Sequence, residues 1–393
     1  MALTPWLSHF KTDFELARRR RGESIAFDAL RCEAFDRFLL LGCPTQADEQ
    51  WRDVDISRIA QANFTLGAPP SASRVREKVA GLPRLDVSGT ELTFINGYFV
   101  PEFSTVAAQA EGVVVASLKA VVAADAGEIA ALAQIAPVDY LPMVALNTAL
   151  FEDGACVIVP PDTTIDQPVH VRFFCNGEAD AKPAMTQPRV LIVVGERGSA
   201  RVVESYSGTP DVEYFTNAVT EIALAEGACL EHHRMQHESD AAYHIAAAHV
   251  VAGPRSKYFA QCVNAGGILV RTETMATLGG EGAESVVGAT NEGTRGVVVN
   301  VHTAVDHAAA GTVSRQRYRW TLTDHALGVL TGRTIVRAGA SDARVRLASR
   351  ARLRSPSARI EMKPTFDILA GDATLTQYSA ITRQQESSSA LRL

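Results

Sequence analysis

The sequence predicts a mainly β protein, a β-solenoid core that follows a helical N-terminal region. Short β-type runs such as CVIVP (156–160) and VVVNVHTAV (297–305) recur from 151 to 370 without intervening helices. Two turn phrases echo each other, ERGSARVVESY (196–206) and EGACLEHHRMQ (226–236), as stacked coils would require. Aromatic residues make up only 7% of the 393 residues, which suits a repetitive core of small side chains. A sandwich or jelly roll predicts similar strands and is the alternative.

Four segments follow along the chain. Residues 1–65 are predicted to be helical, because apolar residues repeat there at three- and four-residue spacing. Residues 66–150 form a linker, rich in proline and serine at its start, and a mixed α/β entry segment. Residues 151–370 form the β core. Residues 371–393 have few apolar side chains and a serine run, so they are expected to be a disordered tail.

Composition excludes several classes of protein. The formal net charge of −6 argues against non-specific nucleic-acid binding, which usually needs a basic excess. No run of about 18 apolar residues is present, so no membrane insertion is expected. The 6 cysteines form no C-x-x-C pair, which indicates a reducing, cytoplasmic compartment. No GxxxxGK[ST] loop occurs, so the chain is not expected to bind ATP by itself.

A histidine-rich stretch suggests an alternative function as a metal-binding or metal-delivery protein. The candidate ligands are His232, His237 and Cys229, which would have to converge across adjacent coils. Their spacing matches no known zinc motif, and alternate residues of a strand point to opposite faces. Surface or lateral histidines of a sheet are the simpler interpretation.

Another polar set lies further along the chain. The residue types Asp306, His307 and Ser314 are those of a hydrolase triad. Asp306 and His307 are neighbours in the sequence, however, and nothing establishes the geometry that a triad needs. A polar network that braces a turn is the better interpretation. A β-helix enzyme that cleaves carbohydrate would need clustered carboxylates, and few acids lie close together in the β zone. We therefore expect no enzyme.

Arginines are concentrated near the end of the β core. Eleven of them lie between 315 and 359, against only Asp324 and Asp342. Strand alternation places Arg346 and Arg350 on one sheet face. A solvated face is the ordinary interpretation, and a surface that meets an acidic partner is the sharper one.

Six ordered blocks carry the resemblance of this sequence to a known family. They are GCPTQADEQWRDVDIS (42–57), FINGYFVPEFS (94–104), ALNTALFEDGACVIVPPDTTIDQPVHV (145–171), PRVLIVVGERGSARVVESY (188–206), VDHAAAGTVSRQRYRWTLTDHALGVLTGRTIVRAGA (305–340) and SARIEMKPTFDI (357–368). These blocks resemble the SufB/SufD family of iron–sulfur cluster assembly subunits, and within it the SufD branch. The positions that match the family's motifs include Trp51, His307, Ser314, Arg315, Gln316, Gly328, Gly332 and Arg333. Asp53 departs from the family, which usually has tyrosine there.

The resemblance implies a fold and a set of partners. The family fold is a right-handed parallel β-helix between helical ends. Family members pair with a SufB-like subunit and bind the ATPase SufC, and they act as non-catalytic scaffolds. An iron–sulfur cluster would then lie at the SufB interface, and ATP would act only through SufC. A homodimer is a further possibility.

The resemblance ends after about Asp372. The family continues with a Cys-[ST]-His-Gly motif and then with helices. Here Leu375 occupies the cysteine column and Gln377 the histidine column. The resemblance thus implies that the C-terminal helical domain is missing or altered, which puts SufC binding in doubt. The partner interface is expected to involve Arg346, Arg350 and Gln377.

Overall fold

The computed structural model describes residues 5–21, 25–61, 64–70, 89–124, 132–179 and 182–383. The predicted linker at 71–88 and the end of the predicted tail, 384–393, lie outside the described residues.

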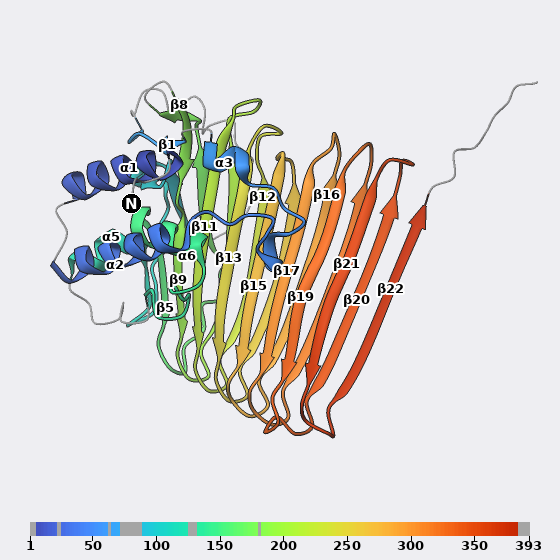
Figure 1. The fold of residues 1–393 in the computed structure, drawn as a ribbon. Coiled ribbons are helices and arrows are strands. Elements are labelled where there is room, and N and C mark those ends of the chain that lie inside the picture. The colour runs from blue at the N-terminus through green and yellow to red at the C-terminus, as the bar shows by residue number, and fades with distance from the viewer. Residues whose placement is uncertain are drawn as a thin grey trace, which may run out of the picture.

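The core is a β-solenoid in which successive strands alternate between two sheets (Figure 1). The first, 12-stranded sheet contains β4 (Val114–Ser117), β5 (Gly154–Val159), β9 (Arg189–Val194), β11 (Tyr214–Leu224), β13 (Tyr243–Ala252), β15 (Leu269–Leu278), β17 (Val298–His307), β19 (Leu327–Val336) and β21 (Arg359–Ile368), with β1 (Thr65–Leu66), β7 (Glu178–Ala179) and β8 (Lys182–Thr186) at its side. We call it the odd sheet.

The second, 10-stranded sheet, the even sheet, contains β2 (Thr90–Ile95), β3 (Tyr98–Phe99), β6 (Val169–Cys175), β10 (Ser199–Gly208), β12 (Cys229–His237), β14 (Lys257–Ala265), β16 (Glu284–Gly293), β18 (Val313–Leu322), β20 (Arg344–Leu353) and β22 (Thr374–Arg383). From β9 onward each strand pairs in parallel with the strand two positions later, so one coil takes about 30 residues, as the pairing of Ser199 with Cys229 shows. The predicted β-solenoid is confirmed.

The turns explain the echoed phrases in the sequence. Arg197 and Gly227 have φ values of 53° and 66° at equivalent places of successive coils. The Arg197 amide donates to the Glu226 carbonyl at 2.9 Å, and the Gly227 amide donates to the Pro254 carbonyl at 2.8 Å. Each turn is therefore hydrogen-bonded to the next one, and a left-handed residue recurs at every coil, a conformation that glycine adopts at the lowest cost.

The interior between the sheets is built from alternating strand residues. Val171, Val202 and Leu230, which belong to neighbouring even strands, are fully buried in the central hydrophobic cluster. Valine and alanine dominate that cluster. At roughly 25 cal/mol per Å² of apolar surface, each such buried side chain contributes about 1.5–3 kcal/mol before the entropy of folding is counted.

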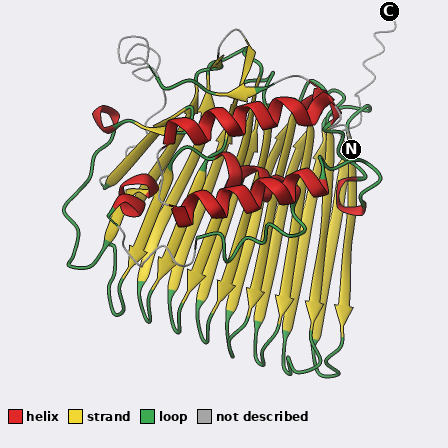
Figure 2. Cartoon of the chain, turned by 60° about the vertical axis from the view of Figure 1, so that its left-hand side comes forward, coloured by secondary structure: helices red, strands yellow, loops and turns green. Residues whose placement is uncertain are grey.

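The N-terminal region packs on the outer face of the odd sheet, as Figure 2 shows. Its helices are α1 (Pro5–Arg21), α2 (Ile25–Leu41), the 3₁₀ helix η1 (Glu49–Trp51), α3 (Ser57–Gln61), α5 (Leu118–Ala123) and α6 (Pro142–Leu150). A second 3₁₀ helix, η2 (Pro101–Phe103), instead contacts β2 of the even sheet. Phe10 and Phe38 join one hydrophobic cluster with Phe215 of β11 and Ile245 of β13. No helix of the described residues is long and apolar enough to cross a membrane.

The predicted disordered tail is wrong for its first part. Thr374–Arg383 forms β22, which pairs along its whole length with β20. The prediction relied on the shortage of apolar side chains in this segment. Among the described residues no further coil packs beyond β22, so this strand does not need alternating apolar side chains. Backbone hydrogen bonds to β20 hold the strand regardless of its side chains.

Candidate functional site

The interior of the solenoid contains a polar cluster in its middle coils. Glu204 of β10 accepts hydrogen bonds from Thr220 Oγ1 at 2.9 Å and from the Tyr206 hydroxyl. Its carboxylate also contacts His232 Nε2 at 2.7 Å, and His232 Nδ1 lies 2.9 Å from the Tyr258 hydroxyl. Burial alone would raise the pKa of Glu204, but the neighbouring His232 and Arg234 outweigh that effect and lower it.

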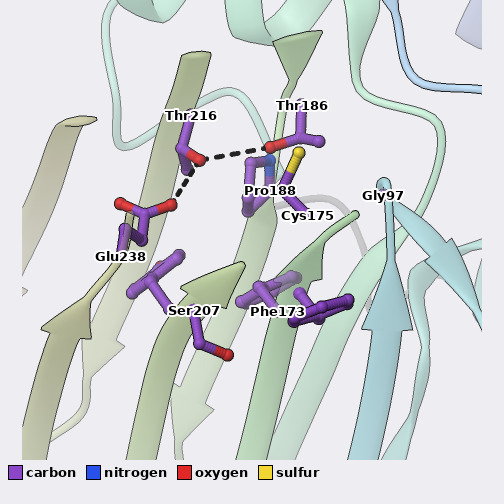
Figure 3. Close-up of a pocket in the computed structure, with 10 residues that line it drawn as sticks. Gly97, Phe173, Cys175, Thr186, Pro188, Ser207, Thr216 and Glu238 are labelled. Carbon is purple, nitrogen blue, oxygen red and sulfur yellow. Dashed lines mark hydrogen bonds between the residues drawn. The ribbon is translucent and has the colours of Figure 1, made fainter. Parts of the chain in front are cut away.

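A neighbouring part of the interior contains only a minute cavity (Figure 3). Thr216 donates to Glu238 at 2.7 Å and lies 3.4 Å from the Thr186 hydroxyl. The cavity beside them measures about 10 Å³. That volume is about one water molecule, so this place is too small for an organic substrate.

The candidate metal ligands do not converge. His232 points into the interior, where both of its ring nitrogens already have partners. Cys229 and His237 lie on the opposite, outer face of β12. In the described part of the chain, no group of three or more His, Cys, Asp or Glu side chains could hold a metal ion. The strand alternation that separates these residues removes the basis of the metal-binding alternative.

The predicted motif residues His307, Ser314 and Gln316 lie inside the solenoid. His307 Nε2 lies 2.8 Å from Ser314 Oγ, and His307 Nδ1 lies 2.8 Å from Thr312 Oγ1. Gln316 donates to Thr334 at 3.1 Å. All of these groups are buried, so they brace the coil from within.

Asp306 does not join them. It lies outside and accepts hydrogen bonds from Arg337 at 2.6 and 3.0 Å. The Asp–His–Ser arrangement that the sequence suggested is therefore not assembled, because neighbouring strand residues face opposite sides of the sheet.

Burial of His307 makes the stability of the fold depend on pH. Burial lowers the pKa of His307 from 6.5 to about 4. Between these values the unfolded chain binds a proton that the folded chain does not, so stability falls as the pH drops from 6.5 to about 4. Between pH 7.5 and 4.5 we expect the wild type to lose about 2 kcal/mol more stability in urea unfolding than a His307→Asn variant. His325→Asn, in an exposed turn, is the control. Equal losses for His307→Asn and the wild type would contradict the assignment.

Motif residues on the outer face of the odd sheet join distant parts of the chain. Trp51 is packed over the guanidinium of Arg271, with 4.2 Å between that group and the ring centre. Asp53, the position that departs from the family motif, binds Lys363 at 2.8 Å. The ion pair thus joins the first resembling block to the last, whereas the stacking contact holds the first block against β15.

A groove of about 870 Å³ runs beside these contacts. The segment 49–53 and the residues Gly332 and Arg333 contribute to its lining. Arg333 is paired with Asp367, and Arg315 on the other sheet is 3.3 Å from Glu284. The predicted residues therefore do not form one site: Gly328 and the His307 set face the interior, whereas Arg315 and Arg333 lie outside.

Sequence reasoning missed a fully buried ion pair between Arg189 of β9 and Glu221 of β11. Glu221 also accepts hydrogen bonds from the amides of Ala133, Ile135 and Ala136 at 2.8–3.0 Å. It thereby fixes the segment before α6 to the odd sheet. A lone charged residue inside the apolar runs RVLIVV and NAVTEIAL was the available signal, since such residues are buried only when they are paired.

The last coil is open at its end. β21 pairs only with β19, and β22 only with β20, among the described residues. Leu375 is 42% exposed and Ile381 is 52% exposed, although they continue the inward-facing rows of Val345 and Ala351. Gln377 shares this inward-facing side, whereas Arg346 and Arg350 lie on the outer face of β20. An unpaired strand edge next to exposed apolar side chains is a natural place for another chain to bind.

Two parallel sheets with a helical region on the outer face of one of them define the class of protein: a β-solenoid with an N-terminal helical region. Comparison with known sequences is more specific. The model of the SufBD protein N-terminal region matches residues 6–171, and that of the SUF system FeS cluster assembly SufBD core domain matches residues 173–388. The chain belongs to the SufBD family of the SUF system for iron–sulfur cluster assembly.

Three known proteins are similar to this chain, and the names of the first two agree with this assignment. An iron–sulfur cluster assembly SufBD family protein of Synechocystis is 27% identical over 94% of this chain and 80% of its own length. The iron–sulfur cluster assembly protein SufD of Escherichia coli is 21% identical over 88% of this chain and 78% of its own length. Protein ABCI7, chloroplastic, of Arabidopsis thaliana is 26% identical over 60% of this chain and 50% of its own length.

Proposed function

We propose that the chain is a SufD-type, non-catalytic scaffold subunit that pairs with a SufB-like subunit through its open end. The open end carries the proposal, because β21 and β22 leave two strand edges and apolar side chains exposed together. The likeness to SufD of E. coli over 88% of the chain supports the SufD assignment. The proposed setting is the cytoplasm, with ATP hydrolysis supplied by a SufC-like partner.

The cluster, as the cargo of this system, would be held mainly by the partner. β22 runs TLTQYSAITR and offers neither a thiol nor an imidazole. Leu375 and Gln377 cannot replace thiolate and imidazole as ligands, since iron–sulfur clusters are held by cysteine and, less often, histidine. We propose that this subunit closes the site and that the SufB-like subunit supplies the ligands.

Co-expression with a SufB-like chain tests the pairing. The variant Leu375→Arg/Ile381→Arg places two charges at the open end, and it should reduce co-purification at least tenfold because a buried, unpaired charge is costly. Thr376→Arg is the matched control, since Thr376 pairs with Arg346 and faces outward on the same strand. Light scattering after size exclusion reports the complexes.

Two results would overturn the proposal. One is a wild-type chain that forms no complex with the SufB-like subunit. The other is a double variant that pairs as well as the Thr376→Arg control.

The isolated wild-type chain should also hydrolyse no ATP.

A further inference from the structure

The outer face of the even sheet carries a block of arginines near the open end. We call it the arginine face; it consists of Arg315, Arg317 and Arg319 of β18 and Arg344, Arg346, Arg350 and Arg352 of β20. The register places arginine directly opposite arginine, Arg315 against Arg346 and Arg319 against Arg350. Like charges that face each other across strands destabilise a sheet.

Most of these side chains have no acidic partner. Arg315 is paired with Glu284 and Arg344 with Asp342, and Arg350 lies 5.6 Å from the ring centre of Tyr378. Among the described residues, no ion pair involves Arg317, Arg319, Arg346, Arg350 or Arg352. All five are exposed.

Several exposed arginines elsewhere in the solenoid pair with acids on the adjacent coil. Arg201 binds Glu231 at 2.6 Å directly across the strands β10 and β12. Arg337 binds Asp306 at 2.6 Å in the same way, from one coil to the one before it. The arginine face departs from this pattern, so its charge is not used for contacts between coils.

We propose that the arginine face is a docking surface for an acidic surface of a protein partner. The unpaired arginines project from one face of two adjacent strands, whose alternate residues are roughly 6–7 Å apart along a strand and whose backbones lie roughly 5 Å apart. Such an array can bind several carboxylates at once, and arginine binds each of them with paired hydrogen bonds.

The charge of the whole chain favours a compact protein over an extended polyanion. The net charge is −6 in spite of this basic block, so the rest of the surface is acidic. A nucleic acid or an anionic membrane would extend beyond the arginine face and meet that acidic surface. Small outward-facing neighbours such as Gly288 and Ala348 offer no row of aromatic rings for stacked bases.

The size of the surface sets the kind of interaction. Two strands of about 10 residues cover roughly 300 Å², less than half of what one partner buries in a stable complex. We therefore expect transient, salt-sensitive binding. This docking surface is distinct from the open end, since Gln377 and its inward-facing neighbours lie on the other side of β22.

Fluorescence anisotropy with labelled poly-L-glutamate of about 20 residues tests the proposal on the full chain. The variant Arg319→Gln/Arg346→Gln/Arg350→Gln should weaken binding at least tenfold, and raising the salt concentration should weaken wild-type binding. Arg197→Gln/Arg201→Gln/Arg255→Gln is the matched control, because these exposed arginines are already paired with acids. It should bind poly-L-glutamate as the wild type does.

Stability and the SufB-like complex provide independent measurements. The Arg319, Arg346 and Arg350 variant should melt at the wild-type temperature or above it, because it loses like-charge repulsion. It should still co-purify with the SufB-like subunit, which separates this proposal from the proposed function.

Four results would overturn the proposal. They are unchanged poly-L-glutamate binding by the variant, loss of the SufB-like complex in that variant, tighter binding of a 20-nucleotide single strand or of phosphatidylserine vesicles at 150 mM salt, and wild-type self-association abolished by the variant. The third would assign the arginine face to phosphate groups, and the fourth would assign it to a second copy of this chain.

Discussion

Glu221→Leu is expected to destabilise the protein by about 3–5 kcal/mol, the largest effect of any single change considered. Glu221 and Arg189 are both fully buried, so removal of the carboxylate leaves a guanidinium without a counter-charge. It also leaves the amides of Ala133, Ile135 and Ala136 without their acceptor. An unsatisfied buried donor costs about 1–3 kcal/mol if water does not reach it.

The reverse change is expected to cost less. In Arg189→Met the carboxylate of Glu221 keeps its three amide donors, and hydrogen bonds to an anion are the strong ones. The substitution removes only the ion pair and the hydrogen bonds that the guanidinium donates to Asn147 and Thr148. This asymmetry follows from the geometry and not from the charges alone.

Urea unfolding and hydrogen exchange measure both effects. Glu221→Leu should lower the free energy of unfolding more than Arg189→Met does, and it should remove exchange protection at residues 133–136. Glu231→Leu is the control, since Glu231 pairs with Arg201 across the same kind of coil boundary but is exposed. Its cost should stay below about 1 kcal/mol. Equal costs for the two buried variants would show that the three amide contacts contribute little.

The solenoid could be predicted because its information is local. Alternation fixes which side chains face inward, and the echoed turns mark the start of successive coils, as Arg197 and Gly227 do. The six blocks that resemble the SufB/SufD family also predicted the family of the protein. These features depend on residues that are close together in the sequence.

The site could not be predicted in the same way, because its contacts join distant residues. Asp53 looked like a departure from the family motif, yet it pairs with Lys363, 310 positions away. His232 looked like a metal ligand because nothing near it in the sequence shows its actual hydrogen-bond partner. That partner, Glu204, lies 28 positions earlier. β22 looked disordered because its stability comes from the backbone of β20, which composition does not report.

Gly332→Ala is expected to cost about 3 kcal/mol, the upper end for overpacking. A Cβ atom added at Gly332 would lie 2.3 Å from the carbonyl oxygen of Thr303, which faces Gly332 across β17 and β19. That oxygen is part of the backbone, so it cannot move aside as a flexible side chain would. The strands must separate locally, which weakens the pairing between these two coils.

Gly339→Ala is the matched control, because nothing lies within 4 Å of a Cβ at that position. The control should be neutral, or slightly stabilising through the reduced entropy of the unfolded chain. Thermal and urea unfolding compare the two variants, and exchange protection in β17 and β19 should fall only for Gly332→Ala. If both variants unfold at the same urea concentration, the close approach of the two strands does not require glycine. The presence of glycine at position 332 would then have to be explained by the groove that Gly332 lines, and not by the packing of the coils.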